Sequence, residues 1–278
     1  MIRLLTIFTL LFCVRVVIAA ERNLDPVELK LISSHSKVAP GEIFKIGVFF
    51  KIDPGWHVYW KYPGEAGLPT VPNFILPAGY TIGEIHWPLP DRFVQGPNLS
   101  GFGYSDELLL TADATVPLNV SPGEFQLSAK VRWLSCSDVC VPGRKEISLP
   151  INVGERLTGP DKELFESWSS RLPALESEST NLFEKSLPVI SEQPDGITVE
   201  VEIRWHASVE DIDWYPAPQP PAEVRNPKIL TLQNISKVTF DIFHPRGEKE
   251  LTAIDSLLVF KSAGKRVGVS VPIMFNFN

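Results

Sequence analysis

Two cysteines four positions apart, Cys136 and Cys140, are the residues of this 278-residue chain best suited to chemistry. The third cysteine, Cys13, lies in an N-terminal segment that we expect to be removed. A disulfide between such near neighbours closes a small loop, so it removes little conformational entropy from the unfolded chain. A strained or exposed small ring is also more easily reduced. We therefore interpret the pair as a redox couple rather than a structural staple.

The chain must turn sharply between these two cysteines if they are to form a disulfide. The bond needs Cα atoms within about 7 Å of each other, whereas an extended strand at roughly 3.3 Å per residue would hold them about 13 Å apart. Ser137 and Asp138, which lie between them, are common turn residues. Strand-like patterns at Glu124–Leu134 and Lys145–Ile151 flank the turn. The sequence thus predicts a disulfide at the tip of a β-hairpin.

The surroundings of the pair predict ordinary thiols that exchange with a better-activated partner. The spacing is not C-x-x-C, and no predicted helix places its N-terminus where it would lower a thiol pKa. Thiol–disulfide exchange requires no cofactor. Two alternatives remain open, an inert clip across the hairpin and a metal site. The metal site lacks a ligand motif, because the five histidines are scattered: His35, His57, His86, His206 and His244.

No other motif in the sequence predicts catalysis. A P-loop, a dinucleotide-binding glycine motif, a nucleophile elbow and a zinc-protease motif are all absent from the sequence. Trp56, Tyr59, Trp60 and Tyr62 favour core packing over a ligand shelf, and His57 favours a strand position over a direct role. The formal net charge of −7 and the lack of a Lys/Arg run in the sequence argue against nucleic acid as a partner.

The N-terminal 20 residues have the composition of a secretory signal. Arg3 precedes an apolar run from Leu4 to Val14, and Ala19 and Ala20 supply a small-residue cleavage site, so we expect cleavage near Ala20. The run is short for a membrane span, which needs about 20 apolar residues. No later stretch is longer or more apolar, so we expect a mature chain that is exported, is not inserted in a membrane and can keep a disulfide.

Short apolar runs separated by proline and glycine predict a mainly β protein. In the first half they predict about seven strands of an antiparallel sandwich. The predicted strands are Val27–Ser33, Ile43–Lys51, the start of Trp56–Pro69, Tyr80–Trp87, Leu108–Val116, Glu124–Leu134 and Lys145–Ile151.

The second half opens with a predicted helix at Lys162–Leu172, with Asp161 as its N-cap and Pro173 as its end. The Glu/Ser-rich run that follows, as far as Lys185, is interpreted as a linker. Further strands are predicted at Ile197–Trp205, Lys237–Phe243, Leu251–Phe260 and Arg266–Phe275. We expect a signal peptide over 1–20, a sandwich with the cysteine pair over 21–154, a helix and linker over 155–187 and a second, smaller β domain over 188–278.

Several ordered motifs resemble the N-terminal periplasmic domain of the DsbD thiol:disulfide interchange proteins, in the ScsB-like branch. They span roughly residues 25 to 152 and leave the second β domain with a looser likeness. The motifs are Gly55-Trp56-His57-Val58-Tyr59-Trp60, Pro63-Gly64-Glu65-Ala66-Gly67-Leu68-Pro69, Trp87-Pro88, Gly103-Tyr104 and Trp133-Leu134-x-Cys136-x3-Cys140-Val141-Pro142.

The resemblance implies an immunoglobulin-like sandwich in the periplasm with Cys136 and Cys140 as its redox couple. It implies that Cys140 attacks, or is attacked by, the partner. In the family the domain receives electrons from a thioredoxin-like domain and reduces thioredoxin-fold proteins, among them disulfide isomerases and cytochrome c maturation factors. It also implies an aromatic cap over the disulfide, for which Phe102 and Tyr104 are the candidates. The cysteine spacing is shorter here than in the best-known member.

The chain contains neither the membrane domain nor the thioredoxin-like domain of the family, so we expect separate partners, including a DsbD-type membrane reductase. It would then be a component of a protein-disulfide reductase rather than a complete enzyme. Two other functions stay open. One is a binding module with a structural disulfide, and the other is copper handling through the two thiols.

Overall fold

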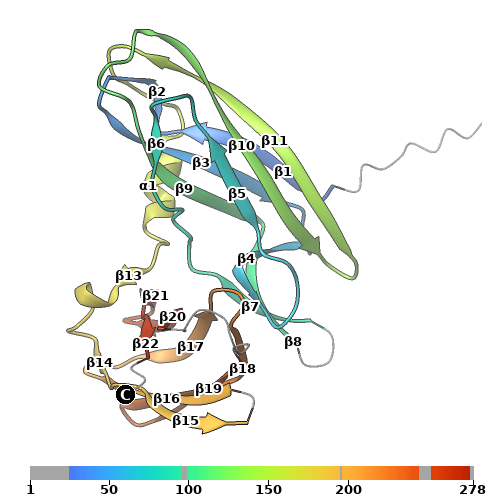
Figure 1. The fold of residues 1–278 in the computed structure, drawn as a ribbon, viewed down its shortest axis with the longest axis vertical. Coiled ribbons are helices and arrows are strands. Elements are labelled where there is room, and N and C mark those ends of the chain that lie inside the picture. The colour runs from blue at the N-terminus through green and yellow to red at the C-terminus, as the bar shows by residue number, and fades with distance from the viewer. Residues whose placement is uncertain (1–24, 96–98, 195, 244–251, 276–278) are drawn as a thin grey trace, which may run out of the picture.

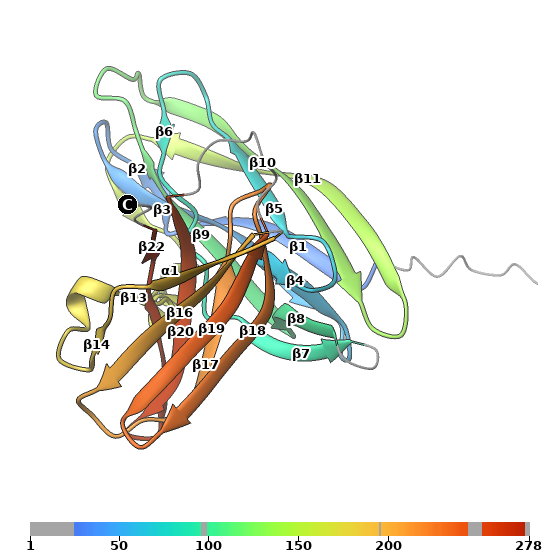
Figure 2. The ribbon, with the colours of Figure 1, turned by 60° about the horizontal axis from the view of Figure 1, so that its bottom comes forward.

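The computed structural model describes residues 25–95, 99–194, 196–243 and 252–275, which form two β units joined by a segment that carries one helix (Figure 1). The first unit contains the cysteine pair, and the second lies against one end of it (Figure 2). The predicted signal peptide, its cleavage site near Ala20 and Cys13 lie outside the described residues, as does His244. The described part of the chain has no helix long and apolar enough to cross a membrane.

The first unit is a sandwich whose smaller sheet has the strand order β1-β3-β9-β6. Its central strands bury large apolar residues such as Phe50 and Leu110 completely, because strands with alternating apolar residues place them on one face. The strands of this sheet are β1 (Val27–Ser33), β3 (Ile43–Ile52), β6 (Thr81–Ile82) and β9 (Glu107–Thr115).

The larger sheet carries the two cysteines. Its order is β12-β2-β11-β10-β4-β8-β7, and β5 also pairs with β10. Its strands are β2 (His35–Val38), β4 (His57–Gly64), β5 (Val71–Ile75), β7 (Asp91–Gln95), β8 (Leu99–Ser105), β10 (Gly123–Cys136), β11 (Cys140–Val153) and β12 (Leu157–Thr158). The two sheets confirm the predicted antiparallel sandwich.

One predicted strand of the sandwich is largely wrong. Only Thr81–Ile82 of the segment Tyr80–Trp87 forms a strand, although His86 makes an isolated bridge to Thr111. Two of its backbone amides still donate hydrogen bonds to β9, from Gly83 to Asp113 and from His86 to Thr111. The segment therefore follows the edge of the sheet without a regular ladder.

Helix α1 (Lys162–Ser169) attaches the connecting segment to the first unit by burying Phe165 and Trp168 in its core. It ends three residues earlier than predicted, because the backbone tightens there and Arg171 donates to the Trp168 carbonyl. Asp161 occupies the N-cap position, but its side chain makes no capping hydrogen bond. The Asp161 carbonyl instead accepts from the Phe165 amide.

The second unit has two sheets around a separate core, with orders β13-β21-β20-β17 and β14-β16-β19-β18; β22 and β15 are added at β20 and β16. Two of its strands, β13 and β14, come from the run interpreted as a linker. The strands are β13 (Ala174–Leu175), β14 (Phe183–Lys185), β15 (Val189–Gln193), β16 (Gly196–Trp205), β17 (Glu210–Ala217), β18 (Glu223–Leu232), β19 (Ile235–Phe243), β20 (Ala253–Ser262), β21 (Lys265–Ser270) and β22 (Ile273–Met274), and a 3-10 turn spans Glu176–Glu178.

The two units are joined by a partly buried ion pair set among aromatic rings. Arg92 of β7 donates two hydrogen bonds to the carboxylate of Asp213 in β17, at 2.8 and 2.6 Å. Its guanidinium also lies over the rings of Phe102 and Tyr215. Burial alone would lower the pKa of Arg92, but the hydrogen bond and charge of Asp213 raise it. Tyr215 belongs to the core of the first unit, so the contact is continuous with that core.

Asp213→Asn should weaken the attachment between the units by about 1–2 kcal/mol, because it leaves a partly buried guanidinium without its counter-charge. Calorimetric unfolding of the variant should show a melting temperature lower by a few degrees. Asp211→Asn is the matched control, since Asp211 lies in the same strand and pairs with Lys261 at an exposed position. Equal melting temperatures for the two variants would contradict the assignment.

Candidate redox site

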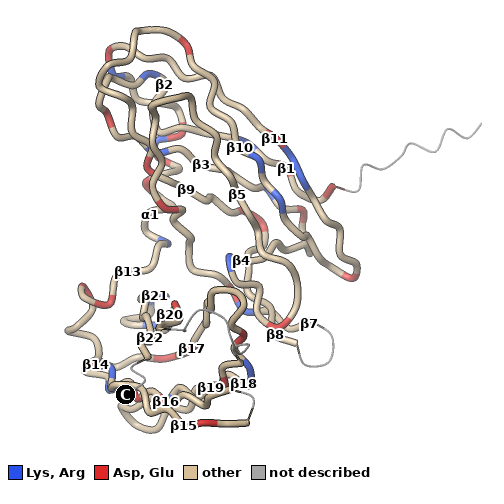
Figure 3. Tube along the Cα trace, viewed as in Figure 1, with Lys and Arg blue, Asp and Glu red and all other residues tan. Residues whose placement is uncertain are grey.

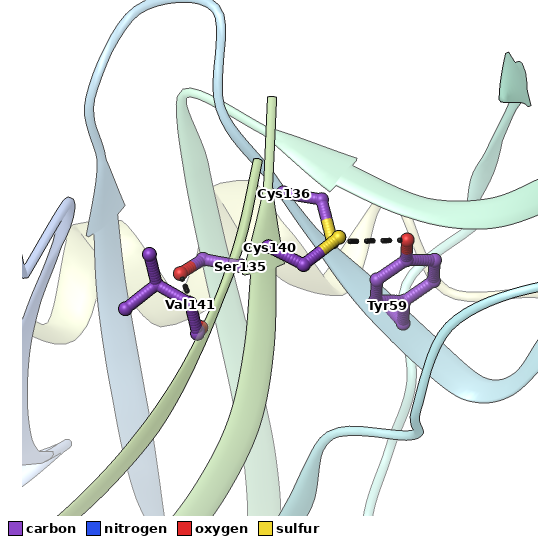
Figure 4. The surroundings of a disulfide bond; sticks show 5 residues. All are labelled: Tyr59, Ser135, Cys136, Cys140 and Val141. Atoms are coloured by element: carbon purple, nitrogen blue, oxygen red, sulfur yellow. Dashed lines mark hydrogen bonds between the residues drawn. A yellow bond between two sulfur atoms is a disulfide. The ribbon is translucent and has the colours of Figure 1, made fainter. Parts of the chain in front are cut away.

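The disulfide joins the last residue of β10 to the first residue of β11, so it closes the tip of a hairpin (Figure 4). The two cysteines are direct cross-strand partners, and their Cα atoms are 4.1 Å apart. Within the turn, the Ser137 amide donates to the Val139 carbonyl. Behind it, the Ser135 hydroxyl donates to the Val141 carbonyl. The hairpin predicted from the sequence is confirmed, with longer strands than expected.

The two sulfur-bearing residues differ in their exposure to solvent. Cys136 is completely buried, because β4 pairs with the end of β10 and places His57 directly opposite it. Cys140 lies on the other side of the hairpin and is exposed, as are the turn residues that precede it. A partner thiol can therefore approach Cys140, whereas Cys136 is shielded. Access is one of the factors that decide which sulfur of a disulfide takes part in exchange.

An aromatic cluster covers the buried sulfur. The hydroxyl of Tyr59 donates a hydrogen bond to the Sγ of Cys136 at 3.3 Å (Figure 4). Tyr59 and His57 are two residues apart in β4, so they share the face of the sheet on which Cys136 lies. The ring of Phe93, in β7, lies 4.0 Å from the His57 ring and 5.7 Å from the Tyr59 ring. Three rings from two strands thus close over this side of the disulfide.

Three glycines make room for these rings. A Cβ on Gly67 would lie 2.2 Å from the Tyr59 ring, and the φ of +98° there is itself unfavourable for other residues. A Cβ on Gly101 would lie 2.4 Å from the Phe93 ring, and one on Gly103 would meet the backbone of β4 at 2.0 Å. The glycines of the loop after β4 and of β8 are therefore part of how the site is built.

The two residues proposed as caps, Phe102 and Tyr104, lie on the opposite face of β8 from this cluster. Phe102 packs against Tyr215 with ring centroids 4.9 Å apart, and Tyr104 donates its hydroxyl to the Pro88 carbonyl. Both side chains are buried. The ring beside the disulfide cluster is Phe93, which the sequence reasoning missed. Its signal was the Asp91-Arg92-Phe93 triplet just before the Gly96-Pro97 turn.

Burial lowers the pKa of His57 below its ordinary value of 6.5. The imidazole is therefore neutral at pH 7 and adds no positive charge beside the sulfurs. In the described part of the chain, no three His, Cys, Asp or Glu side chains lie close enough together to hold a metal ion. Exchange between sulfurs is the chemistry that this arrangement supports directly.

Residues 30–152 match the family model of the thiol:disulfide interchange protein DsbD, N-terminal. This unit is a DsbD N-terminal domain. The match covers the hairpin, the cysteine pair and the aromatic cluster. A DsbD N-terminal domain with one exposed and one buried sulfur in a closed disulfide fits a thiol–disulfide exchange domain.

A solved structure extends the likeness over both units. The chain is similar to the N-terminal periplasmic domain of ScsB from Proteus mirabilis, with a TM-score of 0.64 and 17% identity, over 91% of this chain and 95% of that one. At this identity the likeness shows the fold alone. The major pilin subunit BcpA of Bacillus cereus has a TM-score of 0.28 at 11% identity, over 90% of this chain and 66% of that one, and supports no inference. No curated protein matches the chain.

Tyr59→Phe should lower the reduction potential of the couple, because a hydrogen bond from the Tyr59 hydroxyl stabilises the Cys136 thiolate. Loss of a hydrogen bond worth about 0.5–1.5 kcal/mol corresponds to roughly 10–30 mV. Equilibration in glutathione buffers measures the shift. Tyr80→Phe is the control, because the Tyr80 hydroxyl makes no hydrogen bond within the described residues. An unchanged potential in Tyr59→Phe would show that the contact has no role in the redox step.

His57 should make the domain less stable in acid. Because its pKa is lowered in the folded state, the unfolded chain binds more protons near and below pH 6.5, so stability falls as the pH falls through that region. His57→Gln should flatten the decline between about pH 7 and pH 5. Urea unfolding across this range measures it, with the exposed His206→Gln as the control. Identical slopes in wild type and His57→Gln would contradict the assignment.

Proposed function

We propose that this protein is a periplasmic thiol–disulfide exchange module that relays electrons between thioredoxin-fold partners through Cys136 and Cys140. The observation that carries the proposal is the difference between the two sulfurs. Cys140 is exposed at the hairpin tip, while Cys136 is buried beneath Tyr59. A structural clip gains nothing from such a difference, whereas a relay needs one sulfur that meets the partner and one that resolves the intermediate.

In the reducing direction, the Cys140 thiolate attacks one sulfur of a partner disulfide. A mixed disulfide forms, and the partner's other sulfur leaves as a thiolate that takes up a proton. The Cys136 thiolate then attacks the Cys140 sulfur and releases the second partner thiol. The partner has gained two electrons, and the Cys136–Cys140 disulfide has formed. The reverse sequence, with a reduced donor, restores the dithiol.

The aromatic cluster is assigned two tasks in this cycle. The Tyr59 hydroxyl lies 3.3 Å from the Sγ of Cys136 and would stabilise a thiolate on the resolving sulfur. The ring of Phe93, held over His57 and Tyr59, is proposed as the cap that shields the buried side of the disulfide. Phe102 and Tyr104 would then act by supporting the strand next to β7.

The proposed partners follow from the family of the domain. A thioredoxin-like protein or a DsbD-type membrane reductase would supply the electrons, and thioredoxin-fold proteins such as disulfide isomerases or cytochrome c maturation factors would receive them. The periplasmic location is proposed because the similar ScsB domain is a periplasmic one. The chemistry needs no metal ion or organic cofactor.

Single cysteine variants test the assigned roles. The probe is a thioredoxin that keeps only its attacking cysteine, activated as a mixed disulfide with thionitrobenzoate. Cys136→Ser should couple to it rapidly through Cys140 and stay coupled, whereas wild type should release the thioredoxin in reduced form. Cys140→Ser should couple at least about tenfold more slowly, because its remaining thiol is buried.

Both variants lose the same disulfide, so each serves as the stability control for the other. Non-reducing electrophoresis and the absorbance of the released thionitrobenzoate measure the coupling. Equal coupling rates for the two variants would overturn the assigned roles. Failure of both variants and of wild type to couple would overturn the exchange function itself.

A further inference from the structure

The outer face of the β10–β11 hairpin carries a pair of arginines in register with the disulfide. The two strands pair without a bulge, so directly opposite residues share a face and every second pair lies on the same side. From the tip, the pairs on this face are Cys136–Cys140, Leu134–Pro142, Arg132–Arg144 and Lys130–Glu146. The arginine pair is four residues from the cysteines, which corresponds to about 13 Å along the strands.

The arginines oppose each other across the ladder, an arrangement that disfavours folding. Like charges at directly opposite positions repel, because their Cβ atoms are only about 5 Å apart. Both side chains are exposed, and within the described residues neither makes an ion pair. The next pair differs, because Lys130 and Glu146 face each other with opposite charges at 3.7 Å. A local arrangement that weakens the fold without an internal compensation is a feature expected of functional surfaces.

The surface around the arginines is hollowed and partly apolar. A hollow of about 480 Å³ is bordered by both arginines together with Leu68, Val71 and Pro142. A second, of about 700 Å³, extends from the same arginines toward Asn73 and Lys130. Leu68 is 60% exposed. Figure 3 shows the basic residues gathered along β10 and β11 of a chain whose net charge is −7.

Charge is distributed unevenly along this face. Asp138, in the exposed turn, places a negative charge beside the sulfurs, and the arginines place two positive charges further along the hairpin. An acidic group on a partner is thus repelled at the disulfide and attracted about 13 Å away. The distribution favours one orientation of an approaching surface.

We propose that this face docks a partner protein whose own disulfide lies about 13 Å from a cluster of carboxylates. The inference rests on the proposed exchange function and adds the chemistry of the partner. Arg132 and Arg144 attract the carboxylates, Leu68 and Val71 supply apolar contact, and the exposed sulfur of Cys140 meets the partner disulfide. Complementary charge of this kind raises the rate of encounter and fixes the register of docking.

Synthetic peptides test the docking surface. Each has one cysteine activated as a mixed disulfide with thionitrobenzoate and carries, four to six residues away, three Asp, three Lys or three Ser. The reduced protein converts each peptide disulfide to one peptide thiol and one thionitrobenzoate, and its own dithiol becomes the Cys136–Cys140 disulfide. Absorbance of released thionitrobenzoate gives the rate.

Wild type should react about 5–10 times faster with the acidic peptide than with the basic one at low ionic strength, and the ratio should fall toward one in about 1 M salt. Arg132→Gln/Arg144→Gln should bring the ratio near one at low salt and should leave the rate with the Ser peptide unchanged. The control is Lys228→Gln/Lys265→Gln, which removes the same charge from exposed positions of the second unit and should keep the ratio.

Three outcomes separate the two proposals. A ratio near one in wild type, or a ratio that survives loss of both arginines, overturns the docking surface and leaves the exchange function standing. A loss of selectivity in the lysine control as well would show that net charge, not this face, selects the peptide. Failure of wild type to release thionitrobenzoate from any peptide overturns the exchange function.

Discussion

The pairing of β4 with the last two residues of β10 is the constraint on which the redox site depends. This short ladder places His57 opposite Cys136 and covers one sulfur completely, while Cys140, one strand away, stays exposed. A hairpin alone would leave both sulfurs near solvent, since nothing would cover its tip. The difference in access that the proposed exchange requires is therefore created by a third strand, and not by the disulfide or its turn.

The strands on the far side of β4 connect the site to the second β unit. Strand β7 places Phe93 against the aromatic cluster, and the residue before it, Arg92, pairs with Asp213 of the second unit. Adjacent residues of one strand point to opposite faces, so a single strand contributes to the site on one side and to the contact between units on the other. The second unit thereby fixes the strand that carries the proposed cap.

The sequence predicted the hairpin, the antiparallel sandwich and most strands of its smaller sheet, because alternation and turn residues are local signals. Val27–Ser33 was predicted with the bounds that the structure shows. It did not predict the proximity of Phe93 to His57, which depends on how β7 and β8 add to the sheet. It also missed the arginine pair, because Arg132 and Arg144 are twelve residues apart and form no run of charge until the two strands pair. The helix ended earlier than Pro173 because the backbone tightens after Ser169.

The reduction potential of the Cys136–Cys140 couple tests the central claim most directly. The mature protein can be equilibrated in glutathione buffers of graded potential, alkylated and resolved by mass, which counts the free thiols. An exchangeable couple should show one two-electron transition between about −120 and −270 mV, the range of thioredoxin-fold proteins. A disulfide that stays closed below about −300 mV, as structural disulfides do, would contradict the account.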